Sequence, residues 1–155
     1  FYGMQLAHLG LIVSSVGIAI VSIDGKQQDI RMNIGDSVVL EAYRFEFHGS
    51  RQFEGPNYLS DTGRIKVYEN EQLIAQLYPE KRRYFSQMSN VMTEAAIHAR
   101  LSRDLFVALG EPLADGAWSV RLQYKPMIRW IWLGSIFMAL GGVLAILDKR
   151  YRKHV

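Results

Sequence analysis

The stretch Leu6-Ala7-His8-Leu9-Gly10-Leu11-Ile12-Val13-Ser14-Ser15-Val16-Gly17-Ile18-Ala19-Ile20-Val21 decides how this 155-residue chain folds. It belongs to a segment, residues 1–23, that contains no Asp, Glu, Lys or Arg and that is apolar on every side. A helix of 23 residues is about 34 Å long, which is enough to cross a hydrocarbon core of ~30 Å. We therefore interpret residues 1–23 as a transmembrane helix.

A second apolar run covers residues 127–147 and contains one charge, Arg129. Trp130 and Trp132 lie near its start, where amphipathic rings favour the membrane–water boundary, and Arg129 can extend to the headgroups. A buried core helix is the alternative for both runs, and a signal peptide is the alternative for the first. Helices buried on all sides are uncommon in small domains, and the first run has neither a basic n-region nor a small-x-small cleavage site. The sequence predicts two transmembrane helices and, since it lacks an initiator Met, the C-terminal piece of a longer protein.

The distribution of charge predicts the orientation. Residues 24–126 carry thirteen Lys or Arg and fourteen Asp or Glu, whereas residues 148–155 carry four Lys or Arg and one Asp, and the whole chain has a formal charge of +3. Positive residues next to helix ends stay cytoplasmic. We therefore expect a multi-pass protein of the bacterial inner membrane, with a basic cytoplasmic tail at 148–155 and residues 24–126 in the periplasm. Because the excess charge lies in the tail, we expect contact with membrane lipid and no binding of nucleic acid.

The middle of the chain, residues 24–126, has the period-two pattern of β-strands with one buried face. Apolar and polar residues alternate over residues 43–48 and 118–125, and short turn signals separate such runs. We predict an antiparallel β-rich domain, a sandwich or barrel of about six to eight strands. We further predict a hairpin connection at Asp115-Gly116 and one short helical turn at residues 92–99, with Thr93 as its cap. The fold class is thus a membrane protein in which two transmembrane α-helices flank a small antiparallel β-rich domain.

Catalytic and metal-binding motifs are absent from the sequence. There is no H-E-x-x-H, G-x-S-x-G, P-loop or G-x-G-x-x-G pattern, and without Cys there are no disulfides, thiolate metal sites or covalently attached haem. The remaining polar candidates all favour ordinary roles. They are Glu94 and His98 as a polar pair four residues apart, His48 as a solvated strand residue, His154 as part of the basic tail, and Tyr43, Tyr84 and Arg121 as possible surface contacts.

His8 is different because it lies inside an uncharged apolar segment. An ionisable side chain there is costly unless it faces a bundle interior, a cofactor or a water path. Neutral imidazole is a common axial haem ligand, so both a haem ligand and a histidine bonded to a partner helix remain open. Ala7 and Gly10 would let a flat macrocycle or a neighbouring helix approach closely. Small residues at Gly10-x-x-x-Ser14 and Ser135-x-x-x-Ala139, together with Gly134, Gly141 and Gly142, predict packing against further helices.

Several motifs in order resemble one protein family. Met92-Thr-Glu-Ala-Ala-Ile97, residues 103–111 and 118–126, Arg129-Trp-Ile-Trp132, and residues 138–142 and 148–152 are similar to CcmF, the haem lyase family of the cytochrome c maturation system. The resemblance covers essentially the whole chain and matches about the C-terminal quarter of such a protein. It implies an inner-membrane protein that takes haem from a haem chaperone and joins its vinyl groups to the Cys-x-x-Cys-His thiols of apocytochrome c.

The resemblance also implies a cofactor and a site. The family carries a b-type haem in the membrane with one axial His from each of two transmembrane helices, and His8 matches one of these ligands to the haem iron. The other ligand, the tryptophan-rich haem-handling segment and the periplasmic haem ligands would lie upstream, so this chain alone is not expected to catalyse ligation. Its implied partners are the haem chaperone, the subunits that present the apocytochrome thiols, and apocytochrome c. The alternative is a non-catalytic, membrane-anchored scaffold domain of an assembly complex.

Overall fold

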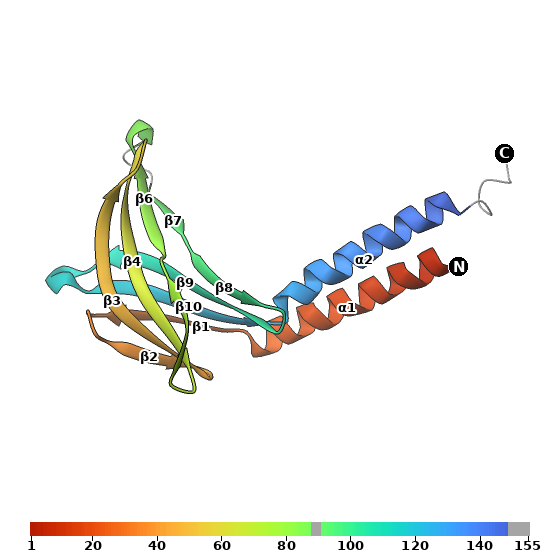
Figure 1. Cartoon of the computed structure of the whole chain (residues 1–155), viewed down its shortest axis with the longest axis horizontal. Coiled ribbons are helices and arrows are strands. Elements are labelled where there is room, and N and C mark those ends of the chain that lie inside the picture. The colour runs from red at the N-terminus through yellow and green to blue at the C-terminus, as the bar shows by residue number, and fades with distance from the viewer. Residues whose placement is uncertain (88–90, 149–155) are drawn as a thin grey trace. The chain divides into compact units, whose positions relative to one another are not determined.

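The structure is a computed structural model that describes residues 1–87 and 91–148. The chain divides into two compact units, which are described separately. The first, here called the helical unit, comprises Phe1–Gly25, Arg100–Asp104 and Lys125–Val155. The second, here called the sandwich unit, comprises residues 26–99 and 105–124. The predicted order of a helix, a β-rich domain and a second helix is confirmed (Figure 1).

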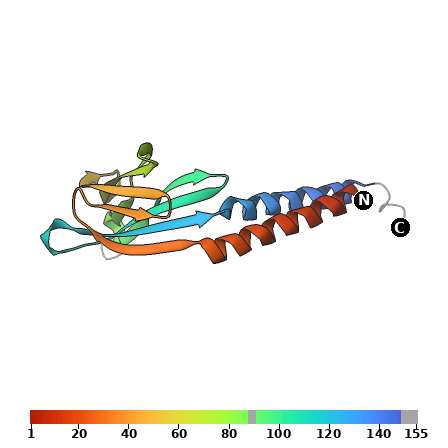
Figure 2. The same ribbon diagram turned by 90° about the horizontal axis from the view of Figure 1, so that it is seen from below.

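The helical unit contains α1 (Tyr2–Asp24) and α2 (Ile128–Leu147), which lie side by side in both views (Figures 1 and 2). The helices are antiparallel, because the N-terminal amine of Phe1 lies 3.7 Å from Asp148 Oδ2. Each helix is long and apolar enough to cross a membrane, and α2 starts where Pro126 ends the preceding strand.

Glycines form the contact between the two helices. Gly3, Gly10 and Gly17 are spaced by seven residues, close to two helical turns, and all three are buried. A Cβ added to Gly10 would lie 2.5 Å from the carbonyl oxygen of Gly134, and one added to Gly3 would lie 2.6 Å from that of Gly141. The backbones are therefore in direct contact, which is how transmembrane helices gain packing energy.

The sandwich unit is built from ten strands over the described residues, more than the six to eight predicted. One sheet has the order β1-β10-β9-β8, and the other has the order β2-β3-β4-β6-β7 with β5 paired to β4. Two single-turn 3₁₀ helices, η1 (Phe85–Gln87) and η2 (Ala114–Gly116), follow β6 and β9. The strands are β1 (Lys26–Met32), β2 (Ser37–Leu40), β3 (Tyr43–Glu54), β4 (Tyr58–Glu69), β5 (Gln72–Leu77), β6 (Glu80–Tyr84), β7 (Val91–Glu94), β8 (Ala96–Arg100), β9 (Arg103–Pro112) and β10 (Trp118–Pro126).

The short helical turn predicted at residues 92–99, with Thr93 as its cap, is wrong. Residues 91–94 form β7 and residues 96–100 form β8. Thr93 pairs with Lys81 of β6 in an antiparallel register, and β8 lies at the edge of the other sheet beside β9. Hydrogen bonds to neighbouring strands thus override the local helix preference of the Ala-rich sequence.

The core lies between the two sheets and follows the predicted alternation. Its fully buried side chains include Phe45, Phe47 and Ile65 of one sheet and Leu105 and Leu122 of the other. Burial of each such side chain contributes about 1.5–3 kcal/mol, so these rows hold the two sheets together.

The hairpin predicted at Asp115-Gly116 is confirmed, since η2 connects β9 to β10 there. Asp115 has φ 73° and Gly116 has φ 81°, a left-handed turn of the kind that Asp and Gly tolerate.

Candidate functional site

His8 is exposed on α1 and makes a hydrogen bond within its own helix. Its Nδ1 lies 2.7 Å from the carbonyl oxygen of Met4. A carbonyl oxygen can only accept a hydrogen bond, so Nδ1 carries the proton and donates it. In neutral imidazole the other nitrogen, Nε2, then keeps its lone pair. A histidine that ligates a metal usually has this arrangement, with one ring nitrogen held by a backbone carbonyl.

The direction of His8 follows from the glycine contact between the helices. Gly10 is buried against α2, and His8 lies two residues away, roughly 160° around a helix with 3.6 residues per turn. The side chain of His8 therefore points away from α2. Met4, Leu11 and Ile12, which are exposed near His8, surround it with apolar groups.

This geometry bears on the two interpretations of His8. The hydrogen bond of His8 goes to Met4 of the same helix and not to α2. Ala7 and Gly10 face α2, because a Cβ added to Gly141 would lie 2.9 Å from the Cβ of Ala7. These two small residues therefore contact the neighbouring helix and are not part of the face that carries His8.

The small residues of α2 divide between the helix contact and the surroundings. Gly134 and Gly141 are buried against α1, whereas Ser135, Ala139 and Gly142 are exposed. A Cβ added to Gly142 would meet no atom within 4 Å. The glycine face of α2 is thus used inside the helical unit.

His8 can offer one nitrogen of a neutral imidazole to a metal. Within the described part of the helical unit it is the only histidine. The described residues contain no group of three or more His, Cys, Asp or Glu side chains that could hold a metal ion. A flat apolar cofactor that accepts one neutral imidazole at its metal, such as haem, fits this exposed and charge-free face.

The turn between β8 and β9 is tied to the start of α2 within the helical unit. Asp104 Oδ1 accepts hydrogen bonds from Arg129 Nε at 2.9 Å and from the backbone N–H of Arg100 at 3.2 Å. The backbone N–H of Met127 donates to the carbonyl oxygen of Ser102 at 2.9 Å. Arg129, which we expect to be able to extend to the headgroups, forms an ion pair with Asp104 while 47% of its side chain stays exposed.

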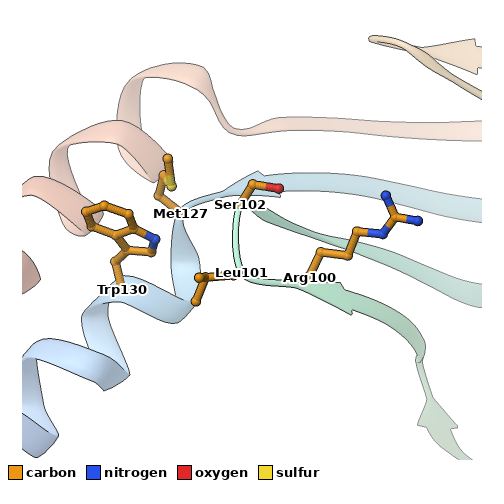
Figure 3. Close-up of a pocket in the computed structure, with 5 residues that line it drawn as sticks. All are labelled: Arg100, Leu101, Ser102, Met127 and Trp130. Carbon is orange, nitrogen blue, oxygen red and sulfur yellow. The ribbon is translucent and has the colours of Figure 1, made fainter.

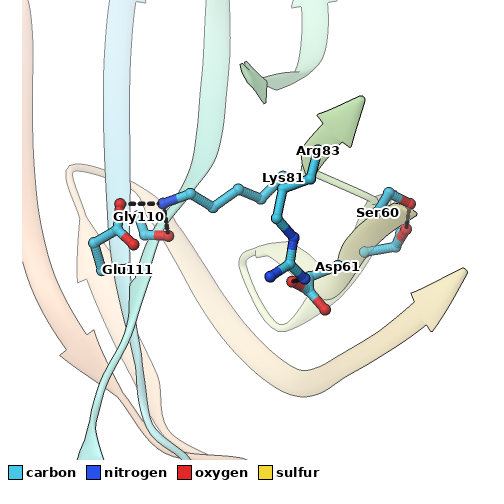
Figure 4. Close-up of polar contacts among 7 residues, drawn as sticks. Ser60, Asp61, Lys81, Arg83, Gly110 and Glu111 are labelled. Atoms are coloured by element: carbon cyan, nitrogen blue, oxygen red, sulfur yellow. Dashed lines mark hydrogen bonds and ion pairs between the residues drawn. The ribbon is translucent and has the colours of Figure 1, made fainter. Parts of the chain in front are cut away.

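A polar cluster joins the two sheets of the sandwich unit (Figure 4). Lys81 of β6 is buried, and its Nζ donates to the carbonyl oxygen of Gly110 at 2.8 Å and pairs with Glu111 of β9. Next to it, Arg83 Nη2 donates to Asp61 Oδ2 at 2.9 Å. These charged groups are paired with one another or with the backbone, so we interpret the cluster as a structural link between the sheets. It offers no activated nucleophile.

The remaining sequence candidates do not come together. His48 is half-buried, with Nε2 at 3.0 Å from Glu46 Oε1, so it is not the solvated residue that we predicted. It lines a cavity of about 760 Å³. Glu94 and His98 are on different strands, and their spacing of four residues therefore has no helical meaning. His154 lies outside the described residues.

The three possible surface contacts have separate structural roles. Tyr43 is buried and stacks on Tyr124, with 6.1 Å between the ring centroids. Tyr84 makes an edge contact with Tyr58 at 5.7 Å. Arg121 is exposed and donates from Nε to Asp29 Oδ1 at 2.6 Å, and this hydrogen bond holds the pKa of Asp29 below its ordinary value.

Fold and site together define a class: an antiparallel β-sandwich inserted between two helices of membrane-spanning length, one of which carries an outward-facing histidine. The family model described as "CcmF C-terminal beta-sandwich" matches residues 24–126. The chain belongs to the CcmF family.

Individual relatives agree with this assignment. The cytochrome c-type biogenesis protein CcmF of Pseudomonas aeruginosa is 54% identical over 155 residues, covering 100% of this chain and 23% of the relative. CcmF of Escherichia coli K12 is 48% identical over 155 residues, covering 100% and 24%. A solved structure named "Cytochrome c Heme Lyase CcmF" has the same fold, with a TM-score of 0.78 and 17% identity over 94% of this chain and 24% of that one. The chain thus spans about a quarter of these proteins.

Proposed function

We propose that this chain forms the C-terminal part of a membrane haem lyase, which helps to deliver haem and attach it covalently to apocytochrome c. The membership in the CcmF family carries the proposal, together with the names of its relatives, which specify cytochrome c-type biogenesis and haem lyase. No catalytic group for the ligation is assigned to these residues, because the described polar clusters are paired structural contacts.

His8 is proposed as one axial ligand of a b-type haem within the membrane. Three observations support this role: the donated Nδ1–H, the exposure of the side chain, and its direction away from α2. When bound, the haem would supply one-electron chemistry that keeps the iron of the substrate haem reduced. His8 would bind the iron through Nε2, while Met4 holds the ring orientation through Nδ1.

The proposed location is the bacterial inner membrane, crossed by α1 and α2 as part of a multi-pass protein. The basic residues after α2 support a cytoplasmic end of the chain, and with two crossings the sandwich would then lie in the periplasm. There it would be available to the haem chaperone, to apocytochrome c and to the subunits that present its thiols. A reporter fused after His154 tests this orientation, since activity on the periplasmic side would reverse it.

The His8 proposal is tested by spectroscopy of the full-length protein. We expect His8→Ala to remove the low-spin b-haem band from the reduced-minus-oxidised spectrum, because one axial ligand is lost. His48→Ala is the matched control, since His48 lies in the sandwich unit, and it should leave the band unchanged. An unchanged band in His8→Ala would exclude His8 as a ligand. If the full-length wild type shows no b-haem band, the alternative of a scaffold without a cofactor is favoured instead.

A further inference from the structure

The turn between β8 and β9 lies against the first turn of α2 (Figure 3). Two contacts fix it there: Met127 N–H to the carbonyl oxygen of Ser102, and Arg129 Nε to Asp104 Oδ1, both at 2.9 Å. One is a backbone bond and the other is an ion pair, and both belong to the helical unit. The position of this turn along α2 is therefore defined.

The tip of the turn presents an apolar side chain outward. Leu101 is 66% exposed although it is a large aliphatic residue. Together with Met127 and Trp130 it lines a cavity of about 430 Å³, which Arg100 and Ser102 also line (Figure 3). Figure 3 shows Leu101 on the same side of the turn as Trp130, whereas the guanidinium of Arg100 extends away from them.

The length of α2 indicates how deep the β8–β9 turn would lie in a bilayer. Its 20 residues span about 30 Å, the thickness of a hydrocarbon core, so its first turn lies at the membrane boundary when the helix crosses. Trp130 is in that first turn, and tryptophan favours this boundary. Because the carbonyl of Ser102 accepts a hydrogen bond from Met127, the residue just before α2, Leu101 lies at the same depth as the first turn of α2.

We propose that the β8–β9 turn is a membrane-docking element in which Leu101 enters the boundary of the lipid bilayer beside Trp130. The partner is the lipid surface: acyl-chain carbons next to the glycerol contact Leu101, Met127 and Trp130, and the headgroups solvate Arg100. A bilayer boundary favours an apolar side chain, a tryptophan and a cation at one depth, and here these are Leu101, Trp130 and Arg100. The inference rests on the proposed membrane crossing of α2 but not on the haem ligand.

The turn thereby contacts the membrane in addition to α1 and α2. The ion pair of Asp104 with Arg129 then neutralises the charge of α2 at this depth, where an unpaired charge would be costly. Removal of the ion pair should therefore loosen the turn without removing α2 from the bilayer.

Depth-dependent quenching in the full-length protein tests the proposal. All native cysteines of the full-length protein are replaced by Ser, and one cysteine is introduced by Leu101→Cys or Leu140→Cys and labelled with a nitrobenzoxadiazole fluorophore. The protein is reconstituted into phosphatidylcholine vesicles that contain a nitroxide at the headgroup, at acyl carbon 5 or at acyl carbon 12. Leu140 is half-exposed in the middle of α2, so it calibrates the centre of the bilayer.

We expect the label at Leu140 to lose most fluorescence to the carbon-12 nitroxide, and the label at Leu101 to lose most to the headgroup and carbon-5 nitroxides. Quenching at Leu140 but not at Leu101 would overturn the docking inference alone. No quenching at Leu140 would overturn the membrane crossing of α2, and the inference with it.

A second measurement in native membranes distinguishes lipid from protein. A photo-reactive benzoylphenylalanine at Leu101 should form adducts with the mass of a phospholipid on irradiation. This measurement needs no cysteine label, so it remains available if the labelled Leu101→Cys protein does not fold. Adducts with another polypeptide in place of lipid would show that a protein surface covers Leu101, and they would refute the proposal.

Discussion

Gly134→Ala should weaken the pairing of α1 with α2, whereas the same substitution at Gly142 should not. A Cβ added to Gly134 would lie 2.4 Å from the carbonyl oxygen of Gly10 and 2.3 Å from Ser14 Oγ. Ordinary contacts begin at 3.4 Å, so the α1 backbone must move by about 1 Å. The environment of Gly142 is open, with no atom within 4 Å of an added Cβ.

The free-energy difference between these variants isolates the packing cost. Alanine is favoured over glycine in a helix by about 1 kcal/mol, but this gain is common to both positions and cancels. A gap of 0.5–1 Å removes a quarter to a half of each contact's attraction, and overpacking typically costs about 1–3 kcal/mol. We therefore expect the free energy of helix separation in Gly134→Ala to be about 1–3 kcal/mol below that in Gly142→Ala.

Energy transfer between the helix ends measures this difference. Tyr2 and Leu147 are exposed at adjacent ends of the helix pair, so cysteines introduced there can carry a donor and an acceptor. In mixed micelles, rising dodecyl sulfate separates the helices and lowers the transfer efficiency. The midpoint should fall for Gly134→Ala and hold or rise for Gly142→Ala. Equal midpoints in the two variants would refute the glycine contact as the basis of helix pairing.

Three further perturbations test other contacts. Asp29→Asn should lower the thermal midpoint at pH 6, because the hydrogen bond from Arg121 lowers the folded-state pKa of Asp29 and thereby stabilises the folded state. The difference from wild type should shrink below about pH 4, where the carboxyl becomes protonated and this stabilisation is lost. A difference that persists unchanged at pH 2 would contradict the prediction for Asp29. Lys81→Met should lower the free energy of unfolding by about 1 kcal/mol, since the carbonyl of Gly110 loses its donor. Lys81→Ala should lower it by about 3 kcal/mol, since the smaller side chain also leaves a cavity. Equal losses for the two variants in urea unfolding would argue against a packing role for the Lys81 side chain. Asp104→Asn should cost about 2 kcal/mol in the same assay, because it removes the negative charge that strengthens the hydrogen bond from Arg129 in the first turn of α2. No loss would mean that this ion pair is solvated.

The fold could be predicted wherever periodicity and length were decisive. Two apolar runs of more than 18 residues require helices, and the alternation over residues 43–48 and 118–125 requires strands with one buried face. Both features depend only on the local sequence. The hairpin at Asp115-Gly116 belongs to the same class, since left-handed φ values there need residues that tolerate them.

The edge strands could not be predicted, because their partners are distant in sequence. Residues 91–100 have an Ala-rich centre that favours a helix, yet they form β7 and β8. Met92 pairs with Arg82, and β8 pairs with β9, so the structure depends on which strands are already in place. Local propensity differs by less than 1 kcal/mol per residue and yields to such pairing.

The candidate site was predicted in part. His8 could be identified because, among Asp, Glu, Lys, Arg and His, it is the one such residue within α1 before Asp24. Its hydrogen bond to Met4 and the pairing of Arg129 with Asp104 could not, since the first depends on rotamer and the second joins residues 25 positions apart. The exposure of Leu101 likewise follows from the docked position of its turn and from no motif.

The glycine contact and the histidine are two consequences of one helical repeat. Gly3, Gly10 and Gly17 return to nearly the same face because seven residues make almost two turns, and that face is occupied by α2. His8 lies two residues before Gly10, roughly 160° around the helix, and therefore points to the opposite side. If His8 ligates haem as proposed, the haem would approach Nε2 from that side, and a second axial ligand would come from a helix other than α2. The helix pair thus fixes the direction of His8, and under the proposed function a substitution that rotates α1 would change haem ligation without replacing the histidine.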